Sequence, residues 1–174
     1  MVNKSKIYYG EHESQFGVLR MPENSNSCPV IVLIHGGFWQ ARYNLEENNP
    51  IADDLTHKGY ATWNIEYRRV GEEGGGWSGT FNDVINAVNH LLKLYESYPI
   101  DLSRVVVIGH SAGGHLALWL ASRIKSTTND SSFNYYEYAV EKGENVKLII
   151  LPDIDHFKII EPTSSAWISV LDSL

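Results

Sequence analysis

The chain has 174 residues and a mass of 19.6 kDa, which is the size of one domain with a core of its own. Hydrophobic residues make up 43% and charged residues 20%, as in an ordinary soluble globular protein. The formal net charge of −7 argues against a nucleic-acid partner, because phosphate binding requires clustered Lys and Arg side chains.

The sequence also disfavours a membrane-spanning protein and a secreted, disulfide-bonded protein. No run approaches the ~20 apolar residues of a membrane span, and the first six residues are not followed by the apolar core of a signal peptide. The single cysteine, Cys28, cannot form an internal disulfide, and we interpret it as a small, partly buried side chain. We therefore expect a cytoplasmic protein with no membrane partner.

Runs of apolar and β-branched residues predict four strands that are buried on both faces of a sheet. They lie at 30–34, 61–67, 105–109 and 146–151. A short antiparallel hairpin is expected before them, around Tyr8 and residues 17–20.

Helical patterns separate these strands. We predict helices over 50–58, 81–95, 114–124 and 135–141. Strands that alternate with helices indicate an α/β fold, doubly wound, with a mostly parallel sheet covered on both faces. In such a sheet the active site lies at the carboxyl ends of the strands. The segments that carry candidate catalytic residues all fall at those ends.

The first of these segments, 109–113, has the pattern Gly-x-Ser-x-Gly with Ser111 at its centre. A serine in this pattern sits on a tight turn between a strand and a helix, which exposes its hydroxyl as a nucleophile. The helix that follows would add its positive end and the free N–H of Ala112 to an oxyanion hole. The alternative is an ordinary glycine-rich turn between a strand and a helix.

The second segment, His35-Gly36-Gly37-Phe38-Trp39, follows the first buried strand. Its glycines allow the loop to present backbone N–H groups, and we expect those of Gly37 and Phe38 to complete the oxyanion hole. Phe38 and Trp39 would line an acyl or aryl pocket, with core packing as the alternative for each. His35 is expected to tie the loop down rather than to act as the base.

Together these motifs resemble the esterase and kynurenine-formamidase-like branch of the α/β-hydrolases. The resemblance is carried by 35–39, 64–69, 74–77, 109–119 and the residues Leu151-Pro152 and His156-Phe157. It implies that Ser111 is the nucleophile and His156 the general base in acyl transfer from a small carboxylic ester or an aryl formamide. The sequence has no Walker-type loop and no His/Cys cluster with metal-ligand spacing, so we expect neither a cofactor nor a metal.

The remaining histidines and an arginine pair are given other roles. His156 has the required position after the serine and ends the last predicted strand, whereas surface or packing roles are expected for His12, His57, His90 and His115. His110 precedes the nucleophile and points elsewhere on the turn, and we expect it to contact the substrate together with Trp39. The pair Arg68-Arg69 is interpreted as a structural ion-pair site rather than a substrate clamp.

The chain departs from the family pattern between its third and fourth predicted helices. The family normally has two more strands there, with their helices, where this chain has a polar loop. We therefore treat residues 1–174 as a single α/β-hydrolase-like domain with an internal deletion around 124–133. The missing part normally carries the acid of the triad. Asp130 is the nearest substitute, because Asp153 and Asp155 stand too close to the histidine in sequence.

Two functions remain open at this stage. The first is a serine hydrolase of small esters or aryl formamides that acts through Ser111. The second is a catalytically impaired or inactive α/β-hydrolase remnant, or a binding module that uses the old pocket. If the last strand does not close the gap, the 105–108 strand keeps an exposed apolar edge, which predicts self-association.

Overall fold

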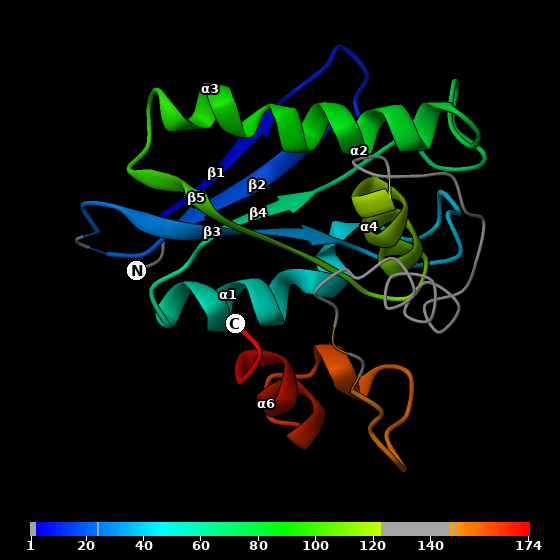
Figure 1. Cartoon of the computed structure of the whole chain (residues 1–174). Coiled ribbons are helices and arrows are strands. Elements are labelled where there is room, and N and C mark those ends of the chain that lie inside the picture. Colours follow the sequence, from blue (N-terminus) through cyan, green and yellow to red (C-terminus); the bar gives the residue numbers. More distant parts are fainter. Residues whose placement is uncertain (1–2, 24, 123–146, 148) are drawn as a thin grey trace.

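The computed structural model describes residues 3–23, 25–122, 147 and 149–174. Its centre is a five-stranded sheet in the order β1-β2-β4-β3-β5 (Figure 1). The strands are β1 (Asn3–Tyr8), β2 (Phe16–Met21), β3 (Cys28–Ile34), β4 (Ala61–Ile65) and β5 (Ile100–Gly109).

A parallel part and an antiparallel flank make up this sheet. β3 pairs in parallel with β4 on one side and with β5 on the other. β1 pairs antiparallel with β2, and β2 with β4, so the expected N-terminal hairpin is confirmed. Because β3, β4 and β5 run in the same direction, the segments that follow them emerge at one edge of the sheet.

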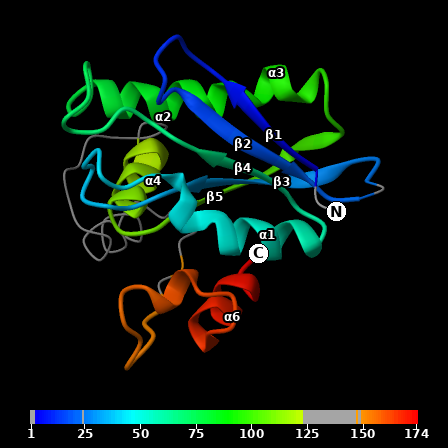
Figure 2. The ribbon, with the colours of Figure 1, turned by 180° about the vertical axis from the view of Figure 1, so that it is seen from behind.

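Helices cover both faces of the sheet, as expected for the α/β fold. They are α1 (Asn49–His57), α2 (Gly79–Asn89), α3 (Leu91–Tyr95), α4 (Ala112–Ser122) and α6 (Ser165–Leu171), with short 3-10 turns η1 (Leu45–Asn48) and η2 (Lys158–Ile160). Figures 1 and 2 show α2 and α3 on one side of the sheet and α1 with α6 on the other. None of the helices in the described ranges is long and apolar enough to cross a bilayer.

Alternate residues of β3 belong to different cores, which is the consequence of the two-residue period of a strand. Val30, Val32 and Ile34 pack in the core shared with α2, α3 and α4. Ile31 and Leu33 pack against α1 and α6. All five side chains are fully buried, so the prediction of a strand covered on both faces is confirmed.

Helix boundaries differ from the sequence-based expectation by more than one residue in two places. The predicted helix 114–124 begins earlier, at Ala112. The single helix predicted over 81–95 is two helices, α2 and α3, that meet at His90. The N–H of His90 still bonds to the carbonyl of Asn86, so the chain stays helical in conformation through the junction. The helix predicted at 135–141 lies outside the described residues.

The strand predicted at 146–151 is wrong for the residues that the structure describes. Lys147 and residues 149–151 have no strand conformation, and 73% of the surface of Ile150 is exposed. The physical reason is that a strand needs a hydrogen-bonded neighbour. Within the described part of the chain, β5 is the last strand of the sheet and pairs with β3 alone.

The chain returns to the sheet at its C-terminal end through α6. Trp167 is fully buried against α1, in the same core as Ile51 and Leu55. Its indole Nε1 donates a hydrogen bond to Oδ2 of Asp54 at 2.7 Å. This contact fixes the segment after His156 to the α1 face of the sheet.

Candidate active site

Ser111 occupies the turn between β5 and α4 with a left-handed backbone, at φ 53°. This conformation costs a non-glycine residue ~1–2 kcal/mol, so it persists only where the surroundings hold it. Two glycines make the turn fit. A Cβ at Gly109 would lie 2.2 Å from the carbonyl oxygen of Gly113, and a Cβ at Gly113 would lie 2.1 Å from that of Ile34. The Gly-x-Ser-x-Gly pattern therefore reflects close backbone contacts.

The loop after β3 lies directly against this turn. A Cβ at Gly36 would be 2.9 Å from the carbonyl oxygen of His110 and 3.1 Å from the Cβ of Ser111. Three consecutive residues in the loop have positive φ, namely Gly37 (92°), Phe38 (55°) and Trp39 (57°). In the described part of the chain, no hydrogen-bond acceptor takes the backbone N–H of Gly37, Phe38 or Ala112.

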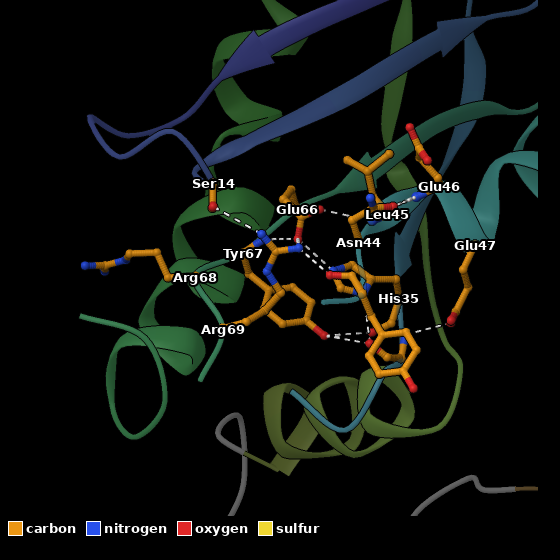
Figure 3. Close-up of polar contacts among 12 residues, drawn as sticks. Ser14, His35, Asn44, Leu45, Glu46, Glu47, Glu66, Tyr67, Arg68 and Arg69 are labelled. Carbon is orange, nitrogen blue, oxygen red and sulfur yellow. Dashed lines mark hydrogen bonds and ion pairs between the residues drawn. The ribbon is translucent and has the colours of Figure 1, made fainter. Parts of the chain in front are cut away.

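A buried network behind the loop holds it in place (Figure 3). Nε2 of His35 lies 2.8 Å from Oε1 of Glu66, and its Nδ1 lies 2.8 Å from the carbonyl oxygen of Gly36. The ring also stacks on Tyr67, whose hydroxyl donates to the carbonyl of His35 at 2.9 Å. Burial raises the pKa of Tyr67, and so does the charge of Glu66, which keeps this hydroxyl a donor. The structure agrees with a structural role for His35.

Arg68 and Arg69 form ion pairs within the scaffold, as expected. Arg68 binds the fully buried Asp83 with two hydrogen bonds of 2.8 and 2.7 Å, and Arg69 binds Glu72 in the same way at 2.9 and 2.8 Å. Burial alone would raise the pKa of Glu72, but hydrogen bonds from Arg69 and Ser14 lower it to about 2. The guanidinium group of Arg68 thus binds α2, and that of Arg69 binds the loop after β4.

The predicted base, His156, lies beside the turn that carries Ser111 and contacts His110 there. It is exposed on a turn and does not end a buried strand, which corrects the expectation. Its carbonyl oxygen lies 2.8 Å from Nε2 of His110, and the two rings are 4.6 Å apart between centroids. No hydrogen bond between Ser111 and His156 is formed among the described residues.

The candidate acids do not contact this histidine where the structure describes them. Asp130 lies outside the described residues. Oδ1 of Asp155 accepts the N–H groups of Phe157 and Lys158 at 3.0 and 3.1 Å, so it caps its own turn. Asp153 is exposed, with φ 57°. Over the described ranges, no group of three or more His, Cys, Asp or Glu side chains could hold a metal ion.

Trp39 and His110, the two predicted substrate contacts, have different surroundings in the structure. Trp39 is half-buried and packs its ring edge-on to His115 at 5.5 Å, and its buried indole Nε1 has no partner among the described residues. His110 is 5% exposed and has both ring nitrogens occupied, Nδ1 by Oε1 of Glu47 at 2.8 Å and Nε2 by the carbonyl of His156. Contact of either residue with a substrate stays a prediction.

Comparison with known proteins defines the family. The model of the family described as BD-FAE matches residues 18–161. The chain belongs to the BD-FAE family. Kynurenine formamidase from Salmo salar is 29% identical over 117 residues, and that from Drosophila melanogaster is 26% identical over 119 residues. Each match covers 67% of this chain, and the chain spans 37% of the length of both relatives.

Solved structures agree with this assignment. A bacterial heroin esterase has a TM-score of 0.58 at 28% identity, over 72% of this chain and 40% of its own. A phosphonate-inhibited esterase B from Lactobacillus rhamnosis has a TM-score of 0.64 at 25% identity, over 83% and 44% of the two chains. This BD-FAE chain thus has a truncated α/β-hydrolase fold and belongs with the esterase- and formamidase-like hydrolases.

Glu47 is the residue of this BD-FAE site that sequence analysis missed. It lies on η1, and its Oε1 accepts the N–H of Gly36 at 2.7 Å and contacts Nδ1 of His110 at 2.8 Å. Glu47 and His110 are 63 residues apart, and no motif surrounds the glutamate. Only the folding of η1 beside the loop after β3 reveals the contact.

Proposed function

We propose that this chain is a serine hydrolase that cleaves small carboxylic esters or aryl formamides by acyl transfer through Ser111. One observation carries the proposal: Ser111 is held in a left-handed turn between β5 and α4, with the Gly36 loop pressed against it. Strained backbone of this kind is concentrated at functional sites, because the surrounding structure must stabilise it. The relatives named above have hydrolase names, which supports the same reaction class.

The reaction would proceed in two steps. Oγ of Ser111 attacks the carbonyl carbon, and His156 accepts the hydroxyl proton and returns it to the leaving alcohol or amine. Water then attacks the acyl-serine, again with His156 as the base, and releases the acid with regeneration of Ser111. The N–H groups of Gly37, Phe38 and Ala112, which have no acceptor among the described residues, would bind the oxyanion in both steps. One such donor is worth about 3–4 kcal/mol in the transition state.

Aromatic side chains near the turn support an acyl or aryl pocket. Phe38 is exposed, and the ring of Trp39 contacts His115, which in turn contacts Phe81. A flat apolar substituent could stack among such rings. His110 could touch a substrate only through its ring carbons, because oxygen atoms occupy both of its nitrogens.

A catalytically impaired hydrolase is the second candidate. It is favoured by the geometry of His156, whose ring has no hydrogen bond to Ser111 or to a carboxylate among the described residues. In a serine protease, loss of the working acid lowers the rate by ~10⁴-fold. The aromatic side chains near the turn could then still bind a small ester or amide without rapid turnover.

The test is labelling of the folded chain with a fluorophosphonate, followed by turnover of p-nitrophenyl butyrate and of N-formylaniline. We expect labelling of the unmodified chain and none of Ser111→Ala, because the probe requires an activated serine. Ser111-dependent turnover at rates typical of esterases would support the first candidate. Labelling with turnover ~10⁴-fold lower would support the second. Equal labelling of both chains would overturn the assignment of the nucleophile.

A further inference from the structure

Glu47 and His110 form an ion pair between η1 and the nucleophile turn. Nδ1 of His110 lies 2.8 Å from Oε1 of Glu47, and the histidine side chain is almost fully buried. The same carboxylate oxygen accepts the backbone N–H of Gly36 at 2.7 Å. Figure 3 shows Glu47 extending toward the loop that carries His35. One glutamate thus contacts the two segments beside Ser111, through the backbone of Gly36 and the side chain of His110.

The second ring nitrogen of His110 makes an equally specific contact. Nε2 lies 2.8 Å from the carbonyl oxygen of His156, in the segment that precedes η2. A carbonyl oxygen and a carboxylate only accept hydrogen bonds, whereas a neutral imidazole has one N–H to donate. Both contacts therefore form together only when the ring of His110 carries two protons and a positive charge.

The electrostatic surroundings favour this charged pair. Burial alone would lower the pKa of His110, but the hydrogen bonds to Glu47 and to the carbonyl of His156, with the charge of Glu47, raise it. Burial alone would raise the pKa of Glu47, but the hydrogen bonds from His110 and Gly36 and the charges of His110 and His35 lower it. The ring of His156, 4.6 Å away, is the titratable group that faces His110 from the C-terminal segment.

We propose that Glu47 and His110 act as a charged clamp that holds His156 and the Gly36 loop beside the turn that carries Ser111. The clamp joins three segments far apart in sequence, namely the loop after β3, the nucleophile turn and the exposed turn at His156. The sequence predicted a strand at 146–151, before His156, and the described residues of that segment do not form it. The clamp holds His156 in place of this strand. The effect of the clamp on rate rests on the proposed function, whereas the clamp itself does not.

The clamp has a defined pH range. Above the raised pKa of His110 the ring loses a proton and keeps only one of its two contacts. Below the lowered pKa of Glu47 the carboxylate becomes neutral and the ion pair is lost. The contribution of the pair to positioning is therefore complete between these two values and decreases on either side.

The first experiment follows the protonation of the histidine rings by NMR in the full chain with ¹⁵N-labelled histidine. His110→Gln assigns the signal of interest. We expect His110 to titrate above the ordinary histidine value of about 6.5. Glu47→Gln should lower that midpoint, whereas the matched control Glu46→Gln, at the exposed neighbouring glutamate, should not change it. Titration at or below the ordinary value, or no effect of Glu47→Gln, would overturn the proposal.

The second experiment tests positioning. Glu47→Gln should remove the nuclear Overhauser contact between the rings of His110 and His156, and persistence of that contact would refute the clamp whether or not the chain is active.

For an active chain we expect kcat of Glu47→Gln to fall by about 10- to 100-fold with a small change in KM, because an error of ~1 Å at a reacting group can cost ~100-fold in rate. The alkaline limb of the rate profile should move to lower pH, while Glu46→Gln behaves as the parent. Unchanged kcat in Glu47→Gln would disprove the positioning role. Altered NMR behaviour in a chain without Ser111-dependent activity would instead reject the proposed function and support the clamp.

Discussion

The ring of Tyr67 stacks on the ring of His35 with 4.4 Å between centroids and 9° between planes, and its hydroxyl bonds to the carbonyl of the same histidine. The contact joins the end of β3 to the end of β4, at the edge of the sheet where Ser111 lies. It has a hydrophobic part and a polar part, which a conservative substitution can separate.

Tyr67→Phe should keep the stacked ring and remove the hydrogen bond. We expect the free energy of unfolding to fall by about 1–3 kcal/mol, because the buried carbonyl of His35 loses a donor. Denaturant unfolding measures this loss, and Tyr95→Phe at an exposed tyrosine is the control. Equal stability of the two variants would contradict the importance of this hydrogen bond.

Gly113→Ala should destabilise the fold much more than a typical glycine substitution. The new Cβ would lie 2.1 Å from the carbonyl oxygen of Ile34, so either β3 or the turn at Ser111 must shift. We expect a loss of about 3 kcal/mol or more in the free energy of unfolding, with loss of fluorophosphonate labelling. Gly59→Ala is the comparison, since nothing lies within 4 Å of its Cβ and only its positive φ opposes the change. Similar behaviour of the two variants would show that the turn is not tightly packed.

We expect that neither of the carboxylates near His156, Asp153 and Asp155, acts as the acid of a catalytic triad. Asp155 caps its own turn and Asp153 is exposed, so Asp153→Asn and Asp155→Asn should change kcat/KM on an activated ester by less than about 3-fold. Asp130→Asn tests the remaining candidate, Asp130, which lies outside the described residues. A fall of ~100-fold or more in one variant alone would identify a working acid and exclude an acid-less dyad.

The outer edge of β5 should support self-association. β5 is the last strand of the sheet within the described residues, and 38% of the surface of Val105 is exposed. Unpaired strand edges pair with other chains, and a lysine on the edge opposes this. Sedimentation should therefore show a concentration-dependent assembly that Val105→Lys weakens and Leu92→Lys, on α3, does not. A parent chain that stays monomeric at all concentrations would contradict the expectation.

The turn that carries Ser111 was predicted from the sequence because the Gly-x-Ser-x-Gly pattern is local. Gly109 is required by the close carbonyl of Gly113 within this pattern, whereas Gly113 is required by the carbonyl of Ile34 on β3. The apolar run 30–34 is buried on both faces, as its composition indicates. The two ion pairs of Arg68 and Arg69 were likewise anticipated.

Only the tertiary structure decided the surroundings of His156. Residues 149–151 have the composition of a strand, but a strand also requires a neighbour at the right distance, and local composition carries no information about that neighbour. The contact of Glu47 with His110 spans 63 residues and depends on where η1 lies relative to the end of β5. The sequence therefore determined the turn at Ser111 and the layered sheet, because a local pattern and apolar runs specify them. The clamp beside Ser111 was decided by packing between distant segments, which no local pattern encodes.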